Sequence, residues 1–337
     1  MNLKLAGVGL TLMAALLAGC SNDKPKITGA GATFPAPIYK EWIKNYQKTA
    51  TVDYSDVGSG KGIDALKTKA VDFGASDAPL NAEEEATIPN AVHIPTVGGA
   101  VVLTYNLAGV TELKLTPEII AGIYLGKIVK WNDPALIAAN PGKTLPDTKI
   151  LPVYRSDSSG TTYVFTSYLK AVNAEWASGP GSGKSIKWPA GTGKEKNPGV
   201  AKQVGDAPGS IGYVELTYAI ANKATVAAVK NKAGNFITPD VDSTAAAIAD
   251  FAAALAKDIK TQTINAPGAK SYPISSLTYA LLVKQGGTPG TAAAAKFWDW
   301  TMQPEQQAAV KSLSYAPLPD ALVKRNLAEL KPIEEGK

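Results

Sequence analysis

Helical and strand-like patterns alternate along nearly the whole chain, and this alternation restricts the fold more than any other feature. Apolar residues that recur every three to four positions predict helices, whereas short apolar runs predict strands. The clearest predicted helices cover residues 35–49, 116–125, 160–172, 243–256 and 290–302, and the clearest predicted strands cover residues 71–75, 92–105, 149–154, 211–214 and 274–284. We expect Pro95 to interrupt the strand over 92–105, and we expect the Gly- and Pro-containing residues 173–200 to be rich in loops. The whole pattern predicts an α/β protein.

Two short segments suit a buried tetrahedral anion. Residues 29–37 (GAGATFPAP) and 155–162 (RSDSSGTT) each place small and hydroxyl residues directly before a predicted helix. Helix N-termini offer free N–H groups and a partial positive charge, so they bind anions without many cations. Arg155 adds a planar fork that matches two anion oxygens, and Asp157 is close enough in sequence to hold it. One site built from both distant segments would lie between two lobes.

Ordinary helix capping is the plainer interpretation of each hydroxyl residue taken alone, because Ser and Thr precede many helices. Three hydroxyl residues that precede predicted helices, Thr33, Ser59 and Ser159, occur together with Arg155. This combination favours an anion site over capping alone.

Other kinds of site fit the sequence poorly. Gly58–Lys61 and Gly179–Ser185 are similar to a nucleotide-binding P-loop, but neither has Gly, four residues and then Gly-Lys-Ser/Thr. His93 is the only histidine and lies in a strand pattern, which indicates a packed structural side chain. One His and one Cys cannot supply a metal cluster or a hydrolytic triad. We therefore expect no metal, no cofactor and no enzymatic activity.

The N-terminus is typical of an export signal. Residues 10–17 are apolar but too few to span a bilayer. The stretch closes with Leu17-Ala18-Gly19-Cys20, which resembles a bacterial lipoprotein signal; an ordinary secretory signal is the alternative. By this resemblance, residues 1–19 are the signal peptide, Cys20 becomes the lipidated first residue, and residues 20–26 form a tether.

Composition limits the partners. The 337 residues carry a formal net charge of +5, and removal of Lys4 with the signal leaves +4. The lysines are scattered, without the aromatic-studded basic stripe of a nucleic-acid-binding protein, so no nucleic acid is expected. A weak positive field could help to attract small anions. The length suits about two domains.

Several motifs together resemble the phosphate-binding proteins of bacterial phosphate-specific ABC transporters. The matching stretches follow one another over essentially the whole chain after the tether: residues 28–37, 71–80, 123–131, 159–169, 211–215 and 315–319. The resemblance implies a two-lobed periplasmic-binding-protein fold, in which two crossover strands near Tyr105 and Tyr272 form a hinge. It implies a lobe I of residues 27–105 and 273–337 and a lobe II of residues 106–272.

The resemblance also implies a site and a function. Phosphate would contact, from lobe I, Thr33, Phe34, Ser59 and Asp77, and, from lobe II, Arg155, Ser159, Gly160 and Thr161. Phe34 and Gly160 would act through their backbone N–H groups. The protein would capture inorganic phosphate outside the cytoplasm, as a monomer anchored to a membrane by lipid. It would deliver the phosphate to the permease subunits of an ABC importer. Through these subunits it would also be coupled to the ATPase of the importer.

Two alternatives stay open at this point: a receptor for another tetrahedral oxyanion such as sulfate, and a phosphate-handling hydrolase. Asp77 bears on the first, because phosphate near neutral pH keeps a P–OH that can donate to a carboxylate, whereas sulfate has no proton to donate. A turn cap before Pro79 is the plainer role for Asp77. The chain departs from the family pattern at Gly60, where Ser is common, and at residues 156–158, where Gly is common; a contact from Ser158 is left open.

Overall fold

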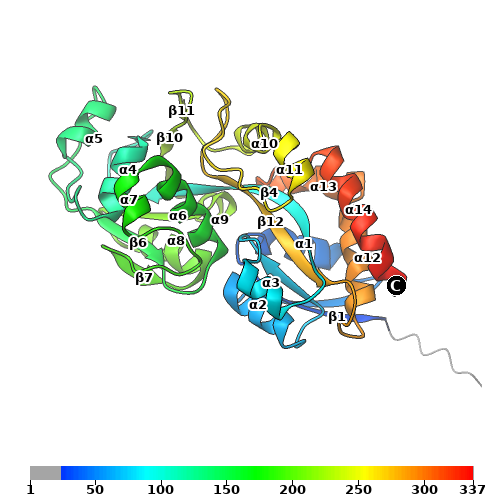
Figure 1. The fold of residues 1–337 in the computed structure, drawn as a ribbon. Coiled ribbons are helices and arrows are strands. Elements are labelled where there is room, and N and C mark those ends of the chain that lie inside the picture. Colours follow the sequence, from blue (N-terminus) through cyan, green and yellow to red (C-terminus); the bar gives the residue numbers. More distant parts are fainter. Residues whose placement is uncertain (1–23, 337) are drawn as a thin grey trace, which may run out of the picture.

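The computed structural model describes residues 24–336. The expected signal peptide and Cys20 lie outside the described residues. Within residues 24–336, no helix is both long enough and apolar enough to cross a membrane. The expected α/β class is confirmed, and the helices and strands form two lobes joined by long strands (Figure 1).

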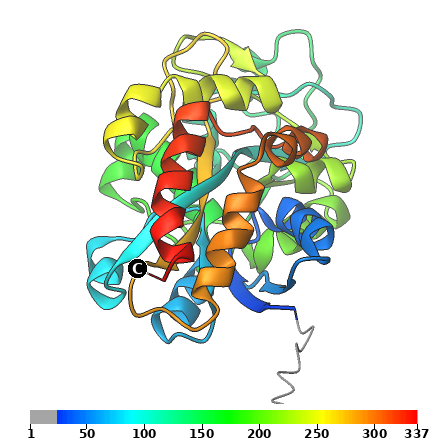
Figure 2. The same cartoon turned by 90° about the vertical axis from the view of Figure 1, so that its right-hand side faces the viewer.

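Lobe I is the part of the chain built on five strands: β1 (Lys26–Gly31), β2 (Thr51–Ser55), β3 (Phe73–Ser76), β4 (Ala91–Tyr105) and β12 (Ser275–Val283). Their order is β2-β1-β3-β12-β4; β1 is parallel to β2 and β3, and β12 is antiparallel to β3 and β4. The helices of this lobe are α1 (Ala36–Tyr46), α2 (Ser59–Lys67), α3 (Ala82–Thr87), α12 (Thr291–Thr301), α13 (Pro304–Ala309), the 3-10 helix η1 (Val310–Leu313) and α14 (Asp320–Glu334). α12 and α14 lie side by side (Figure 2).

Lobe II is the part built around the end of β4 and the strands β6 (Leu151–Arg155), β7 (Thr192–Lys194), β8 (Ser210–Glu215) and β9 (Thr225–Val226). The order continues as β4-β8-β6-β7, with β9 also paired to β4. Its helices are α4 (Pro117–Tyr124), α5 (Pro134–Ala139), α6 (Gly160–Val172), α7 (Ala174–Ser178), α8 (Lys196–Asp206) and α9 (Leu216–Ala221). A small sheet joins β5 (Lys114–Leu115), β10 (Ala228–Lys230) and β11 (Phe236–Ile237), and α10 (Val241–Ala249) and α11 (Ala252–Lys257) follow it.

Strand β4 belongs to both lobes. Its first part, as far as Ala100, pairs with β12, and its last part, from Val101, pairs with β8. The returning chain lies beside this point, because the Tyr272 hydroxyl donates to the Val101 carbonyl at 3.0 Å. Two adjacent segments therefore connect the lobes, which is the arrangement of a two-segment hinge.

The expected interruption of β4 at Pro95 is wrong, because the strand continues through it. The pairing register with β12 shifts between Thr278 and Tyr279, which lie opposite Val97 and Pro95. A bulge of this kind accommodates one extra residue, and proline, which has no N–H to donate, is tolerated beside it.

The expectation of a loop-rich segment at residues 173–200 is correct for residues 179–191, between α7 and β7, but not for the rest of the segment. This segment holds α7, β7 and the first turn of α8. Pro198 lies in that first turn, where a missing N–H costs little because the first N–H groups of a helix have no partner within it. The early start of α8 places Asn197 in the protein interior.

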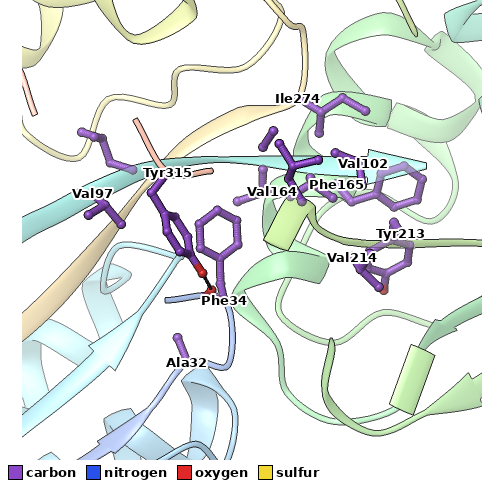
Figure 3. Packing of buried hydrophobic residues seen from close by; sticks show 14 of the residues in the cluster. Ala32, Phe34, Val97, Val102, Val164, Phe165, Tyr213, Val214, Ile274 and Tyr315 are labelled. Atoms are coloured by element: carbon purple, nitrogen blue, oxygen red, sulfur yellow. Dashed lines mark hydrogen bonds between the residues drawn. The ribbon is translucent and has the colours of Figure 1, made fainter. Parts of the chain in front are cut away.

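Buried side chains continue from one lobe into the other along β4. Phe34 and Tyr315 pack at the lobe I end, and Phe165 and Tyr213 pack at the lobe II end (Figure 3). The rings of Phe165 and Tyr213 stack with centroids 4.4 Å apart. Such close packing makes each lobe stiff and concentrates any relative motion at the crossover.

Candidate functional site

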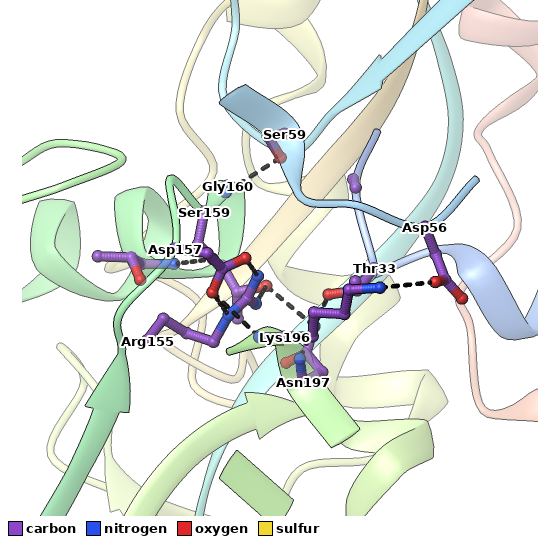
Figure 4. Close-up of polar contacts among 12 residues, drawn as sticks. Thr33, Asp56, Ser59, Arg155, Asp157, Ser159, Gly160, Lys196 and Asn197 are labelled. Atoms are coloured by element: carbon purple, nitrogen blue, oxygen red, sulfur yellow. Dashed lines mark hydrogen bonds and ion pairs between the residues drawn. The ribbon is translucent and has the colours of Figure 1, made fainter. Parts of the chain in front are cut away.

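Two helix N-termini from different lobes meet at one point. α2 begins at Ser59 and α6 begins at Gly160, and the Gly160 N–H donates to Ser59 Oγ at 3.0 Å (Figure 4). A Cβ atom at Gly160 would lie 2.5 Å from both Ser59 Oγ and Asp77 Oδ2, so only glycine fits this approach. The positive ends of both helix dipoles therefore point into a shared region where they would stabilise an anion.

The turn between β1 and α1 forms the next part of the site. The Thr33 carbonyl accepts from the Tyr218 hydroxyl at 2.6 Å, and the Phe34 carbonyl accepts from the Tyr315 hydroxyl at 2.6 Å. Figure 3 shows the second of these bonds. Both residues are buried, and the Phe34 ring packs in the core rather than in the site. With both carbonyls held by tyrosines, this turn can present its N–H groups to an acceptor.

Arg155 stands at the end of β6 and is only 3% exposed. Its Nε and Nη2 donate to the two oxygens of Asp157 at 2.7 and 2.6 Å, and its Nη1 donates to Thr161 Oγ1 at 3.4 Å. Burial alone would raise the pKa of Asp157, but the hydrogen bonds and charge of Arg155 outweigh this, and the pKa lies below its usual value. Asp157 thus stays ionised and holds the guanidinium plane in one orientation.

Asp77 follows β3 and is 1% exposed. Its Oδ1 accepts from Thr278 Oγ1 at 2.8 Å, and its Oδ2 accepts from Thr161 Oγ1 at 3.5 Å. Burial raises the pKa of Asp77 to about 7, although Thr278, Arg155 and Thr161 act in the opposite direction. Ser76, rather than Asp77, closes the following turn, since its Oγ accepts from the Ala78 N–H.

The remaining predicted residues belong to the same network. Ser159 Oγ accepts from the Thr162 N–H at 3.1 Å and so caps α6, as the plainer interpretation proposed. The hydroxyl of the buried Thr161 accepts a hydrogen bond from Arg155 and donates one to Asp77. All eight residues predicted to contact the anion, from both lobes, therefore lie in one cluster or directly beside it.

Two further residues join the cluster that sequence reasoning missed. Asn197 Nδ2 donates to Thr33 Oγ1 at 2.9 Å and to Thr161 Oγ1 at 3.2 Å. The Lys196 N–H donates to Asp157 Oδ1 at 3.0 Å. Both residues lie in the Gly- and Pro-rich segment expected to be loop, and the only local signal was Asn197-Pro198, a dipeptide typical of a turn or helix start.

The two departures from the family pattern turn out to be neighbours. A Cβ atom at Gly60 would lie 2.5 Å from Ser158 Cβ and 2.2 Å from Ser158 Oγ. The Gly60 N–H donates to the Ser158 carbonyl at 3.1 Å. Glycine at 60 thus makes room for serine at 158, and the Gly60 N–H is already paired with a protein acceptor.

Ion pairs connect the lobes around the cluster. Lys184 of lobe II pairs with Glu84 of α3, and Lys196 pairs with Asp56, which follows β2. A cavity of about 710 Å³ lies on the Lys184 side and is lined partly by Ala78 and Ser158, which flank the cluster. Polar and charged groups from both lobes thus flank the cluster on this side.

Metal ligands and the single histidine are the groups that a hydrolase would need. Among residues 24–336, no three His, Cys, Asp or Glu side chains are grouped so that they could hold a metal ion. His93 is buried in β4, where its Nε2 accepts from the Leu80 N–H at 3.0 Å and burial lowers its pKa to about 4. The imidazole is therefore neutral near pH 7 and satisfied by the backbone, as the sequence predicted.

Comparison with known proteins gives consistent matches. A family model described as a PBP superfamily domain matches residues 18–305. The phosphate-binding protein PstS of Pasteurella multocida is 42% identical over 310 residues, which cover 90% of each chain. The protein of the same name from Xylella fastidiosa strain 9a5c is 42% identical over 305 residues, covering 89% of this chain and 83% of the relative. The solved structure of a periplasmic phosphate-binding protein, PfluDING, bound with phosphate has a similar fold, with a TM-score of 0.74, 23% identity, and coverage of 90% of this chain and 93% of that one.

Proposed function

Because the chain belongs to the PBP superfamily, and within it to the family of phosphate-binding proteins named PstS, we propose that it binds inorganic phosphate between its two lobes. This is a family of binding proteins and not of enzymes. The observation that carries the proposal is the buried Asp77 beside the buried Arg155, in a cluster that also contains two helix N-termini. A carboxyl group in an anion site is expected only if a proton is shared between the two, and phosphate brings such a proton near neutral pH.

Each group has a role in this proposal. Arg155 donates to phosphate through guanidinium N–H groups that do not face Asp157, and Asp157 keeps it oriented. Thr33, Ser59, Ser159 and Thr161 donate through hydroxyls, whereas Phe34 and Gly160 donate through backbone N–H groups. Phosphate oxygens then compete with Ser59 Oγ for the Gly160 N–H. Asp77 accepts a hydrogen bond from the P–OH group when it is ionised and donates one to a phosphate oxygen when it is protonated. Its pKa of about 7 means that both protonation states are populated near neutral pH.

Physical chemistry explains why such a site suits phosphate. A dehydrated dianion is costly to bury, and fixed dipoles together with one guanidinium compensate for this without bulk positive charge. The lobes close around the anion by motion at the β4 and β12 crossover and so exclude water. We place lobe I at residues 27–105 and 273–337 and lobe II at residues 106–272; β4 changes its partner strand between Ala100 and Val101, about five residues before that boundary.

The wider role follows from the family. We propose that the closed lobes are recognised by the permease of an ABC importer, whose ATPase drives uptake of the released phosphate. We further propose that the protein acts as a monomer outside the cytoplasm and is anchored to a membrane through lipid on Cys20. The sequence pattern Leu17-Ala18-Gly19-Cys20 supports the anchor.

Calorimetric titration of the chain from Ser21 onward with phosphate and with sulfate tests the proposed ligand. We expect tight binding of phosphate and little or no binding of sulfate. Equal affinity for both anions would favour a general oxyanion receptor. Hydrolysis of a phosphomonoester by metal-replete protein would instead favour the hydrolase alternative.

A further inference from the structure

Asn197 is fully buried in the first turn of α8, and its surroundings fix its orientation. Its Oδ1 accepts from the Glu215 N–H at 3.1 Å. A backbone N–H can only donate, so the side-chain atom facing Glu215 must be the amide oxygen. The amide nitrogen therefore faces the site, where Figure 4 shows Asn197 beside Thr33.

The hydrogen bonds of Asn197 fill the acceptor positions of two threonines. Thr33 Oγ1 accepts from Asn197 Nδ2 at 2.9 Å and from the Asn197 N–H at 3.4 Å. Thr161 Oγ1 accepts from Asn197 Nδ2 at 3.2 Å and from Arg155 Nη1 at 3.4 Å. A hydroxyl has two acceptor lone pairs and one proton, so both hydroxyls are left able only to donate, and the Thr161 proton faces Asp77 Oδ2 at 3.5 Å.

The start of α8 is itself held in place by the site. Lys196 has a φ of 62°, in the left-handed region that a side chain rarely adopts. Its N–H donates to Asp157 Oδ1, and its Nζ pairs with Asp56 of lobe I at 3.3 Å. The carboxylate that orients Arg155 thus also positions the turn that carries Asn197.

We infer that Asn197 is a positioning residue that turns Thr33 and Thr161 into obligate donors toward a bound oxyanion once the lobes close. Asn197 and Thr161 belong to lobe II and Thr33 to lobe I, so the complete arrangement exists only in the closed form. This inference rests on the proposed function, because the Thr33 proton needs an acceptor such as a phosphate oxygen, and the same oxyanion would take the Thr161 proton from its long contact with Asp77.

The test is the phosphate affinity of Asn197→Ala and Asn197→Asp, measured by calorimetry. Asn197→Ala frees both hydroxyls to rotate, and we expect affinity to fall roughly tenfold. In Asn197→Asp an ionised carboxylate accepts from the threonine hydroxyls and draws their protons away from the anion, so we expect a larger loss, of roughly a hundredfold. Lowering the pH should reduce the difference in phosphate affinity between the two variants, since the introduced carboxyl regains a proton. A difference that stays constant with pH, or an equal loss of affinity in both variants, would overturn the inference.

A matched control and a double-mutant cycle separate positioning from mere packing. Asn140 is also buried, and its amide group donates to the Lys114 and Leu136 carbonyls away from the site; Asn140→Ala should keep phosphate affinity. In a Thr33→Val, Thr161→Val background, Asn197→Ala should cost little further affinity, because the hydroxyls it acts through are gone. If Asn197→Ala costs as much affinity in this background as in the wild type, the inference is contradicted. If the wild type does not bind phosphate, the proposed function is contradicted instead.

Discussion

The Gly160 N–H donates to Ser59 Oγ at 3.0 Å, which joins the first residue of α6 to the first residue of α2 across the two lobes. Neither residue has a charge, yet each lies at the positive end of a helix. The contact requires that the lobes are closed and that position 160 has no side chain. An anion bound here would accept hydrogen bonds from donors of both lobes and would strengthen closure in that way.

The first prediction concerns closure. Phosphate should draw the lobes together because its oxygens accept from donors on both of them. Small-angle scattering should show a smaller radius of gyration with saturating phosphate than without it. The same measurement with sulfate serves as the control and should leave the profile unchanged. An unchanged profile with phosphate would indicate a preformed site or none.

The second prediction ranks two site residues. Arg155→Ala should weaken phosphate binding by roughly a hundredfold or more, because it removes a charge-assisted contact and leaves Asp157 without its cation. Ser59→Ala removes one neutral donor among several, so the loss should be about two- to tenfold. Calorimetry of both variants provides the comparison.

Arg325, the chain's other arginine, supplies the control for this ranking. Its Nη1 donates to the His93 carbonyl at 3.1 Å, outside the cluster. Arg325→Ala should bind phosphate as the wild type does. Equal losses for Arg155→Ala and Ser59→Ala would show that the role given to Arg155 is wrong.

The third prediction concerns selectivity at Asp77. Sulfate has no proton to donate, so at pH 8, where Asp77 is mostly ionised, it faces an unpaired buried acceptor in the wild type. Asp77→Asn replaces one carboxylate oxygen by a donor and removes that penalty. The variant should still bind phosphate, but its preference for phosphate over sulfate should narrow by roughly tenfold or more. If the variant rejects sulfate as firmly as the wild type, another group must discriminate between the anions.

The fourth prediction concerns pH and stability without phosphate. Burial raises the pKa of Asp77 to about 7, so between pH 4 and pH 7 the folded protein binds more protons at this site than the unfolded chain does. The free energy of unfolding should therefore fall, through this group, as pH rises across that window. Asp77→Asn lacks the effect.

Urea unfolding of the wild type and Asp77→Asn at pH 5 and pH 8 measures this difference. The stability of the variant relative to the wild type should rise by roughly 2–3 kcal/mol between the two pH values. Other titrating groups, including the buried Glu215, are common to both proteins. A difference that does not change with pH would mean that the Asp77 carboxyl titrates near its ordinary pKa.

The fifth prediction concerns the N-terminus. Labelled fatty acid should enter the wild-type protein in a bacterial host and should not enter Cys20→Ser, because Cys20 is the only thiol in the chain. Gel electrophoresis with detection of the label is sufficient. Equal labelling of both proteins would reject the lipoprotein interpretation.

Local patterns were enough to predict much of the fold. The stripe of Ile38, Trp42 and Tyr46 predicted α1, and all three side chains are buried. The alternation of such helices with apolar strands predicted the α/β class, because each pattern depends on neighbours only a few residues away. Prediction failed in the segment of α8, where Pro198 and Gly199 suggested a loop although a helix can begin with both. Composition does not distinguish these two uses of the same residues.

The order of residues along the chain specifies which chemical groups are available: one histidine, one cysteine, hydroxyls before helices, and Arg155 two residues before Asp157. The way these groups are used depends on the folded arrangement. Asp77 has a raised pKa only because the fold buries it, and the hydrogen bonds from Thr278 and Thr161 offset only part of that effect. Asn197 can orient Thr33 only because two lobes bring residues from distant parts of the chain together. Hydrogen bonding and desolvation depend on distances of a few ångströms in space, and separation along the chain does not specify those distances.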